Sequence, residues 1–148
     1  MKARILVVED HAQFRQAIHS ILSRDGDLEV IAEAVDGLAA VQCAEELKPD
    51  LIVLDIGLPK LNGLEAARRI AHVAPASKII FLTQESSVEV VRRAFHLRAC
   101  GYVVKSDAEN DLLPAIHAVL RGDTFLGLRF NEELRTDVLQ GGARISLV

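Results

Sequence analysis

Two cysteines in 148 residues are too few for a disulfide framework, and Cys43 and Cys100 do not have the spacing of a zinc site. Long apolar runs are also absent: the runs at residues 5–8 and 51–54 are four residues long, and both stop at a carboxylate. Such runs are too short to cross a bilayer or to form the core of a signal peptide. We therefore expect a cytoplasmic protein that makes no contact with a membrane.

Positive charge is not in excess either, because 17 Lys and Arg face 21 Asp and Glu, which gives a net charge of -4. Non-specific binding to nucleic acid depends mainly on the attraction of Lys and Arg for phosphates, so we do not expect this chain to bind DNA or RNA through its own surface charge. Half of the residues are hydrophobic. This composition suits one domain with a single core and excludes disordered and collagen-like chains.

What the chain does have is a regular alternation of two apolar patterns. Short continuous runs rich in β-branched residues are typical of strands buried on both faces of a parallel sheet. Between them, hydrophobic residues recur at helical spacing, as in residues 14–22 and 112–120. The sequence therefore predicts an α/β fold of the (βα)5 type, a doubly wound five-stranded parallel sheet with helices on both faces. The predicted strands cover residues 5–8, 28–32, 51–54, 79–82 and 102–104.

Chemically active side chains follow four of these strands. Glu9 and Asp10 follow the first, Asp55 the third, Thr83 the fourth and Lys105 the fifth. Ligands of doubly wound sheets bind at the carboxyl ends of the strands, so we expect these side chains to meet there. Two carboxylates about 4 Å apart repel by about 4 kcal/mol at an effective dielectric constant of about 20, so a cation belongs among them. Mg²⁺ and the ammonium of Lys105 fit this role and suit phosphoryl transfer.

The motifs at these strand ends make the pattern specific. Together they resemble the CheY-like receiver domains of two-component response regulators, over about residues 3–121. The resemblance implies a flavodoxin/CheY-like three-layer sandwich with strand order 2-1-3-4-5. Residues 9–15 and 105–106 further resemble the NarL/FixJ subfamily. The motifs are Val8-Glu9-Asp10-His11, Leu54-Asp55-Ile56-Gly57-Leu58-Pro59-Lys60-Leu61-Asn62-Gly63, Leu82-Thr83 and Gly101-Tyr102-Val103-Val104-Lys105-Ser106.

The resemblance implies a role for each acidic residue. Asp55 would accept a phosphoryl group from a phosphohistidine of a sensor histidine kinase or phosphotransfer protein. Glu9, Asp10, Asp55 and the backbone carbonyl of Gly57 would hold Mg²⁺ or Mn²⁺. Such a domain is a phosphoacceptor in signalling and not an enzyme with turnover. His11 is interpreted as a surface residue at the start of a helix, not as a metal ligand.

The resemblance also implies a switch. Thr83 and Lys105 would bind the new phosphoryl oxygens, and Tyr102 would rotate into the space that the Thr83 hydroxyl leaves. This change would repack the surface of the fourth helix, fifth strand and fifth helix. The fourth helix, expected at about residues 87–97, is apolar on two sides, and one of them is open to a partner or to solvent. A homodimer would form through this surface or through the first and fifth helices.

Three positions depart from the family pattern. Gln84 follows Thr83 where the family mostly has a small residue, and its side chain is expected to narrow access to the phosphoryl group. Arg98 stands where a glycine would suit a left-handed helix end, so it is expected to adopt that conformation at a cost of about 1 kcal/mol. Pro114 is tolerable only near the first turn of a helix, which predicts that the fifth helix begins nearer Asn110 than Ser106.

Two other functions remain open. A phosphatase of the haloacid dehalogenase type also uses an aspartate nucleophile after a strand, but it needs a second aspartate two residues later, where this chain has Gly57. A receiver-like module can also bind partners without phosphorylation, but such a module would usually have lost part of the acidic set or the lysine.

The end of the chain is expected to lie outside the receiver domain proper. We assign residues 1–121 to the receiver domain and residues 122–148 to a tail or the start of an interdomain linker, with a short helix capped by Asn131. NarL/FixJ receivers commonly precede a helix-turn-helix domain that binds DNA, and these residues are too few to form one. The chain is expected to be either the receiver segment of a longer transcription factor or a stand-alone receiver that acts on another protein.

Overall fold

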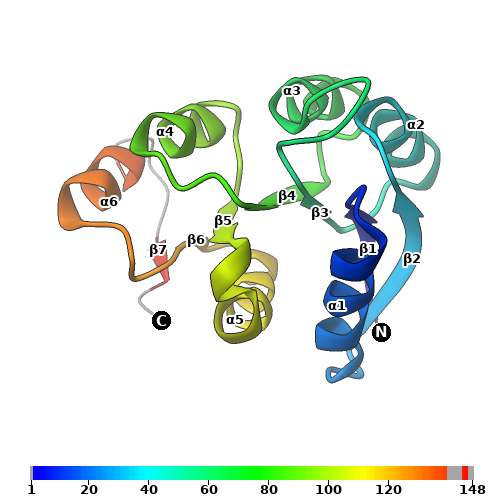
Figure 1. Ribbon diagram of the computed structural model, residues 1–148, viewed down its shortest axis with the longest axis horizontal. Coiled ribbons are helices and arrows are strands. Elements are labelled where there is room, and N and C mark those ends of the chain that lie inside the picture. The colour runs from blue at the N-terminus through cyan, green and yellow to red at the C-terminus, as the bar shows by residue number, and fades with distance from the viewer. Residues whose placement is uncertain (1, 140–144, 147–148) are drawn as a thin grey trace.

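A parallel β-sheet forms the centre of the molecule, with helices packed on both of its faces (Figure 1). The computed structural model describes residues 2–139 and 145–146. Within these residues the strand order is β2-β1-β3-β4-β5-β6-β7, and every neighbouring pair is parallel. The strands are β1 (Ala3–Val8), β2 (Leu28–Ala34), β3 (Leu51–Leu54), β4 (Lys78–Thr83), β5 (Gly101–Val104), β6 (Thr124–Leu126) and β7 (Ile145–Ser146).

The helices form the two outer layers. Helices α1 and α5 cover one face of the sheet, and α2, α3 and α4 cover the other (Figure 1). Within the described residues, every helix is too short or too polar to cross a lipid bilayer. The helices are α1 (Ala12–Ser23), α2 (Gly37–Leu47), α3 (Gly63–Val73), α4 (Val88–His96), α5 (Ala108–Leu120) and α6 (Glu132–Leu139), with a 3-10 turn η1 (Lys105–Asp107) before α5.

Side chains that alternate along the buried strands fill two cores. In β1, Ile5 and Val7 pack against α1 and α5, whereas Leu6 and Val8 pack on the opposite face. All four side chains are buried. Because both faces of the sheet are covered, every position of such a strand is apolar, which explains the continuous runs in the sequence.

The predicted strand order 2-1-3-4-5 is confirmed for β1 to β5, but the predicted number of strands is wrong. The short strand β6 pairs with the outer edge of β5, and the two-residue strand β7 pairs with β6. Phe125 and Leu126 of β6 are fully buried, one in each core. Strands of two or three residues are shorter than the four to about eight residues that periodicity can detect.

The prediction for Pro114 is also wrong. Helix α5 begins at Ala108, so Pro114 lies in its second turn. The proline removes the hydrogen bond that its backbone nitrogen would donate to the carbonyl of Asn110. Asn110 is exposed, so water can satisfy that carbonyl instead. By contrast, Arg98 adopts the left-handed conformation that the sequence predicts, with a φ of 67°.

Candidate functional site

The predicted site residues lie at the carboxyl ends of the central strands. Glu9 follows β1 directly, Asp55 follows β3, Thr83 ends β4 and Lys105 follows β5. Because β1, β3, β4 and β5 are successive neighbours in one parallel sheet, these side chains share one edge. Glu9, Asp55 and Thr83 are at most 5% exposed.

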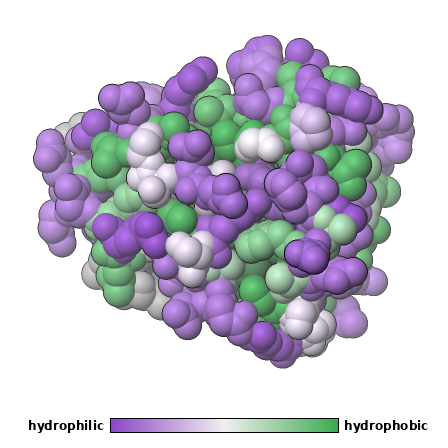
Figure 2. Space-filling model, viewed as in Figure 1, coloured by the Kyte–Doolittle hydropathy of each residue, from purple (hydrophilic) through white to green (hydrophobic). Residues whose placement is uncertain are grey.

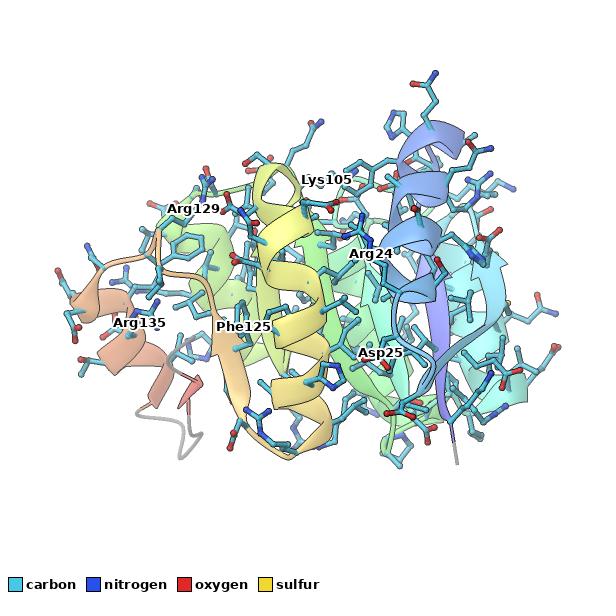
Figure 3. The ribbon with its side chains drawn as sticks, turned by 90° about the horizontal axis from the view of Figure 1, so that it is seen from below. Arg24, Asp25, Lys105, Phe125, Arg129 and Arg135 are labelled. Carbon is cyan, nitrogen blue, oxygen red and sulfur yellow. The ribbon has the colours of Figure 1, made fainter. Side chains whose placement is uncertain are left out.

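Lys105 joins the two buried carboxylates. Its Nζ lies 2.9 Å from Asp55 Oδ2 and 2.6 Å from Glu9 Oε1. The first contact is a hydrogen bond, whereas the geometry of the second makes it an ion pair only. Nζ also lies 4.7 Å from the centre of the Phe14 ring, which attracts a cation through its π electrons. The ammonium therefore occupies the centre of the site, near the start of α5 in Figure 3.

The ammonium stays charged at neutral pH. Burial alone would lower the pKa of Lys105, but the hydrogen bond to Asp55 and the negative charges of Asp55 and Glu9 outweigh burial and raise the pKa above its ordinary value. A positive charge held beside Asp55 attracts the anionic oxygens of any group that approaches this carboxylate. It also offsets the repulsion between the two carboxylates when no other cation is present.

An acidic group beside this pair can hold a divalent cation. Glu9, Asp10 and His11 offer ligand atoms that lie within 4.8 Å of one another. Within the described residues, the buried oxygens Glu9 Oε1 and Asp10 Oδ1 accept no hydrogen bond. Carboxylate oxygens are the ligands that Mg²⁺ and Mn²⁺ prefer. Glu9 Oε1 pairs with Lys105 Nζ and Asp10 Oδ1 lies 3.3 Å from His11 Nδ1, but neither oxygen is occupied by a hydrogen bond from the described residues, so the residues present fit such an ion. Asp55 is connected to this group through Lys105.

His11 was not expected in this group. Its side chain is 70% exposed at the start of α1, as the sequence predicts, and its Nδ1 lies 3.2 Å from Glu9 Oε2 and 3.3 Å from Asp10 Oδ1. The His11 backbone amide also donates a hydrogen bond to Glu9 Oε2. The second oxygen of Glu9 is thereby engaged, and Oε1 is left facing Lys105.

The predicted switch residues both contact the Glu85 peptide. Thr83 Oγ1 accepts a long hydrogen bond of 3.4 Å from the Glu85 backbone nitrogen, and the Tyr102 hydroxyl donates one of 2.8 Å to the Glu85 carbonyl oxygen. Tyr102 is fully buried, and this burial raises the pKa of its hydroxyl, so it remains protonated. Its ring packs against Phe81 and against Phe130 from the far end of the chain.

A shallow cavity opens beside the lysine. Its volume is about 420 Å³. Gln84, predicted to affect access, lies in its wall and is exposed. The side chain thus stands where a molecule that approaches Lys105 would pass. The lining residues are His11, Phe14, Gln84, Val104, Lys105 and Ser106.

The loop between β3 and α3 fixes the position of Asp55. The Asp55 amide donates to the Val8 carbonyl, and the Gly57 amide points at Asp55 Oδ1 over 3.4 Å. Gly63, the first residue of α3, donates to the Ile56 carbonyl over 2.7 Å. A Cβ on Gly63 would lie 2.0 Å from the Asp55 carbonyl oxygen. Only glycine allows α3 to start this close to the acidic strand end.

The acidic group makes a prediction about metal binding. With Mg²⁺ at about ten times its dissociation constant, the native protein should gain about 1.4 kcal/mol, which raises its melting temperature by about 3–6 °C. Asp10→Ala should lose this gain, and in EDTA it should be at least as stable as the native protein because one like charge beside Glu9 is gone. The measurement is thermal unfolding with and without Mg²⁺. Asp27→Ala, at an exposed acid outside the site, is the control and should keep the full shift.

Comparison with known proteins identifies the family. The family model described as the response regulator receiver domain matches residues 5–117, which is most of the chain. The chain belongs to this family. Oxygen regulatory protein NreC of Staphylococcus aureus is 34% identical to this receiver domain over 132 residues, which cover 88% of the chain and 61% of NreC.

Solved receiver domains have the same fold. A LuxR-family two-component response regulator from Aurantimonas sp. is 30% identical, with a TM-score of 0.83 over 96% of this chain and 99% of that one. The receiver domain of NarL from Mycobacterium tuberculosis is 26% identical, with a TM-score of 0.77 over 82% and 98%. The predicted resemblance to receivers of the NarL type is thus confirmed. The chain spans between 53% and 61% of the length of the first curated relatives that it matches.

Proposed function

We propose that this receiver domain accepts a phosphoryl group on Asp55 from a phosphohistidine of a sensor histidine kinase or phosphotransfer protein. The observation that carries the proposal is the buried pairing of Asp55 with Lys105, beside the clustered carboxylates of Glu9 and Asp10. A nucleophilic carboxylate, an ammonium held beside it and carboxylate oxygens that can hold a divalent cation are the parts that phosphoryl transfer needs.

In the proposed step, an oxygen of Asp55 forms a bond to phosphorus while the bond from phosphorus to the histidine nitrogen breaks. The imidazole leaves with the electron pair of that bond. Asp55 Oδ2 is held by Lys105, whereas Oδ1 meets the Gly57 amide at the long distance of 3.4 Å. Oδ1 is the less strongly engaged of the two oxygens, and in this proposal it is the one that attacks. The cavity beside Lys105 is the direction from which the donor would come.

The other residues neutralise and position the transferred group. Glu9, Asp10, Asp55 and the carbonyl of Gly57 would hold Mg²⁺ or Mn²⁺, which supplies charge neutralisation on the phosphoryl oxygens when bound. Lys105 would move from its contact with the Asp55 carboxylate to a phosphoryl oxygen, and the Thr83 hydroxyl would donate to another. The proposed step needs positioning and charge neutralisation more than acid or base catalysis.

The switch and the output belong to the same proposal. Movement of Thr83 and Tyr102 would shift the Glu85 peptide and repack the α4-β5-α5 surface, and a homodimer would form through that surface or through α1 and α5. NreC is named as an oxygen regulatory protein, and DegU of Brevibacillus brevis, 32% identical, as a transcriptional regulatory protein. We infer that the output is control of transcription through a DNA-binding domain beyond these residues, with a stand-alone receiver as the alternative.

The test is incubation with a small phosphodonor and Mg²⁺, followed by intact mass. We expect the native protein to gain about 80 Da, the mass of one phosphoryl group, and Asp55→Asn to gain nothing. EDTA should abolish the gain on the native protein.

Two outcomes would contradict the proposal. The absence of an adduct on the native protein would favour a partner-binding module that works without phosphorylation. Continued release of phosphate from an added monoester, over many turnovers, would favour the phosphatase.

A further inference from the structure

The C-terminal part of the described chain lies on the surface that the proposed switch would repack. Strand β6 pairs with β5, where Tyr102 faces Leu126, and α6 packs against α4 (Figure 1). Three apolar side chains of residues 127–139, Phe130, Leu134 and Val138, are at most 8% exposed. They belong to the same hydrophobic cluster as Val91, Ala94 and Tyr102. We call residues 127–139 the cover segment.

The cover segment is held to α4 by charge as well as by apolar contact. The Arg92 guanidinium of α4 pairs with Asp137 of α6, with nitrogens 2.7 and 2.9 Å from Oδ2. Within the segment, the buried Arg135 donates to the Gly127 carbonyl over 2.7 Å and closes the loop before α6. On the face of the molecule shown in Figure 2, hydrophobic side chains occur in small groups separated by hydrophilic ones. The apolar side of α4 that the sequence left open is thus largely covered by this chain itself.

A second contact ties the cover segment to the phosphoacceptor site. Arg129 donates to both carboxylate oxygens of Asp107, over 2.6 and 3.0 Å, and to Ser106 Oγ over 3.0 Å. Ser106 and Asp107 follow Lys105 in the turn η1. Arg129 and Lys105 lie toward the same end of the sheet in Figure 3. Lys105 thus belongs to the same three-residue turn as the two residues that Arg129 binds, so a shift of the Lys105 backbone would move that turn.

The third contact involves the switch residue directly. The Phe130 ring meets the Tyr102 ring edge to face, with 6.0 Å between centroids and an interplanar angle of 85°. This is a favourable geometry for an aromatic pair. Rotation of Tyr102 toward Thr83 would take away the ring against which Phe130 packs.

We propose that the cover segment is an intramolecular occupant of the α4-β5-α5 face, and that phosphorylation of Asp55 weakens its hold through Tyr102 and η1. This part rests on the proposed function, whereas the occupancy itself does not. While the segment is bound, a partner that docks on α4 must displace it. The surface of α1 and α5 carries no such cover among the described residues, so a dimer of the covered protein would use that surface.

Hydrogen exchange on the full chain tests the coupling. Peptides from residues 127–139 and 84–87 are followed by mass spectrometry in EDTA and with Mg²⁺ and a small phosphodonor, and the intact mass of each sample is recorded. We expect exchange in the cover segment to rise about threefold or more when the adduct is present, because an aromatic pair of this kind is lost. An adduct without faster exchange would overturn the coupling but leave the proposed function standing.

If no adduct forms, a reciprocal measurement tests the coupling between the cover segment and residues 84–87. Coupling between two sites acts in both directions, so Phe130→Ala in EDTA should speed exchange at residues 84–87, which contact Tyr102 through the Glu85 carbonyl. Leu128→Ala removes an apolar side chain that is 74% exposed in the same segment and should leave residues 84–87 unchanged. Arg129→Ala, at a partly exposed side chain, gives a second variant if Phe130→Ala does not fold. Effects confined to residues 127–139 in both variants would overturn the proposal.

Discussion

Lys105→Met should lower the free energy of unfolding by about 3–5 kcal/mol at neutral pH in EDTA. Methionine keeps most of the length and volume of the lysine stem, so the main loss is the charge. Glu9 and Asp55 would then lie buried in one site with no cation between them. Removing one partner of a buried ion pair costs this much because the remaining charges keep their desolvation penalty. Urea unfolding followed by circular dichroism measures the change.

Lys60→Met is the matched control. Lys60 Nζ lies 3.6 Å from Asp36 Oδ2, but its side chain is 66% exposed. Exposed ion pairs contribute about 1 kcal/mol or less, so this variant should lose little. Millimolar Mg²⁺ should restore part of the stability of Lys105→Met and none of that of Lys60→Met. Equal losses in the two variants would show that Lys105 does not neutralise a buried acidic pair.

Gly63→Ala should destabilise the protein by about 3 kcal/mol or more and slow modification of Asp55. The new Cβ would lie 2.0 Å from the Asp55 carbonyl oxygen and 2.7 Å from Ile56 Cα. Both atoms belong to the backbone, so a side-chain rotation cannot relieve the overlap. The start of α3 must move away from the strand end, and Asp55 moves with it. Urea unfolding and the rate of the mass gain with phosphodonor and Mg²⁺ report the two effects separately.

Gly57→Ala, in the same loop, is the control for this variant. No atom lies within 4 Å of a Cβ built at Gly57, and its φ is not in the left-handed region. Because Gly57 is itself a proposed metal ligand, this variant controls for stability and not for the rate of modification. We expect its free energy of unfolding to change by no more than about 0.5 kcal/mol. A Gly63→Ala variant as stable as Gly57→Ala would contradict the tight approach of α3 to Asp55.

The sequence was most informative where local pattern and topology agree. Buried parallel strands need apolar residues at every position, so the runs at β1 and β3 were visible directly. An acidic residue that directly follows such a strand must lie at the carboxyl edge of the sheet. This is why Glu9, Asp55 and Lys105 could be expected to meet before any coordinates were known. The roles of Thr83 and Tyr102 still rest on family resemblance and remain predictions.

The contacts of the C-terminal segment could not be predicted from the sequence. Asn131 was expected to cap a short helix, and its Oδ1 does accept a hydrogen bond from the Leu134 amide. A cap determines where a helix begins but not against which surface it packs. The pairing of Arg92 with Asp137 spans 45 positions, and nothing in the local sequence around either residue indicates so distant a partner. The Phe130 contact with Tyr102 was missed for the same reason.

The main-chain contacts of Glu85 determine which substitutions this position can tolerate. Thr83 and Tyr102 both engage main-chain atoms of residue 85, its N–H and its carbonyl oxygen. Every residue type has the backbone carbonyl oxygen, and every type except proline has the N–H. The exposed side chain of residue 85 can therefore change in size and charge while the main-chain hydrogen bonds with Thr83 and Tyr102 stay the same. Substitution of residue 85 would alter the charge and shape of the surface beside Thr83 without removing either main-chain contact.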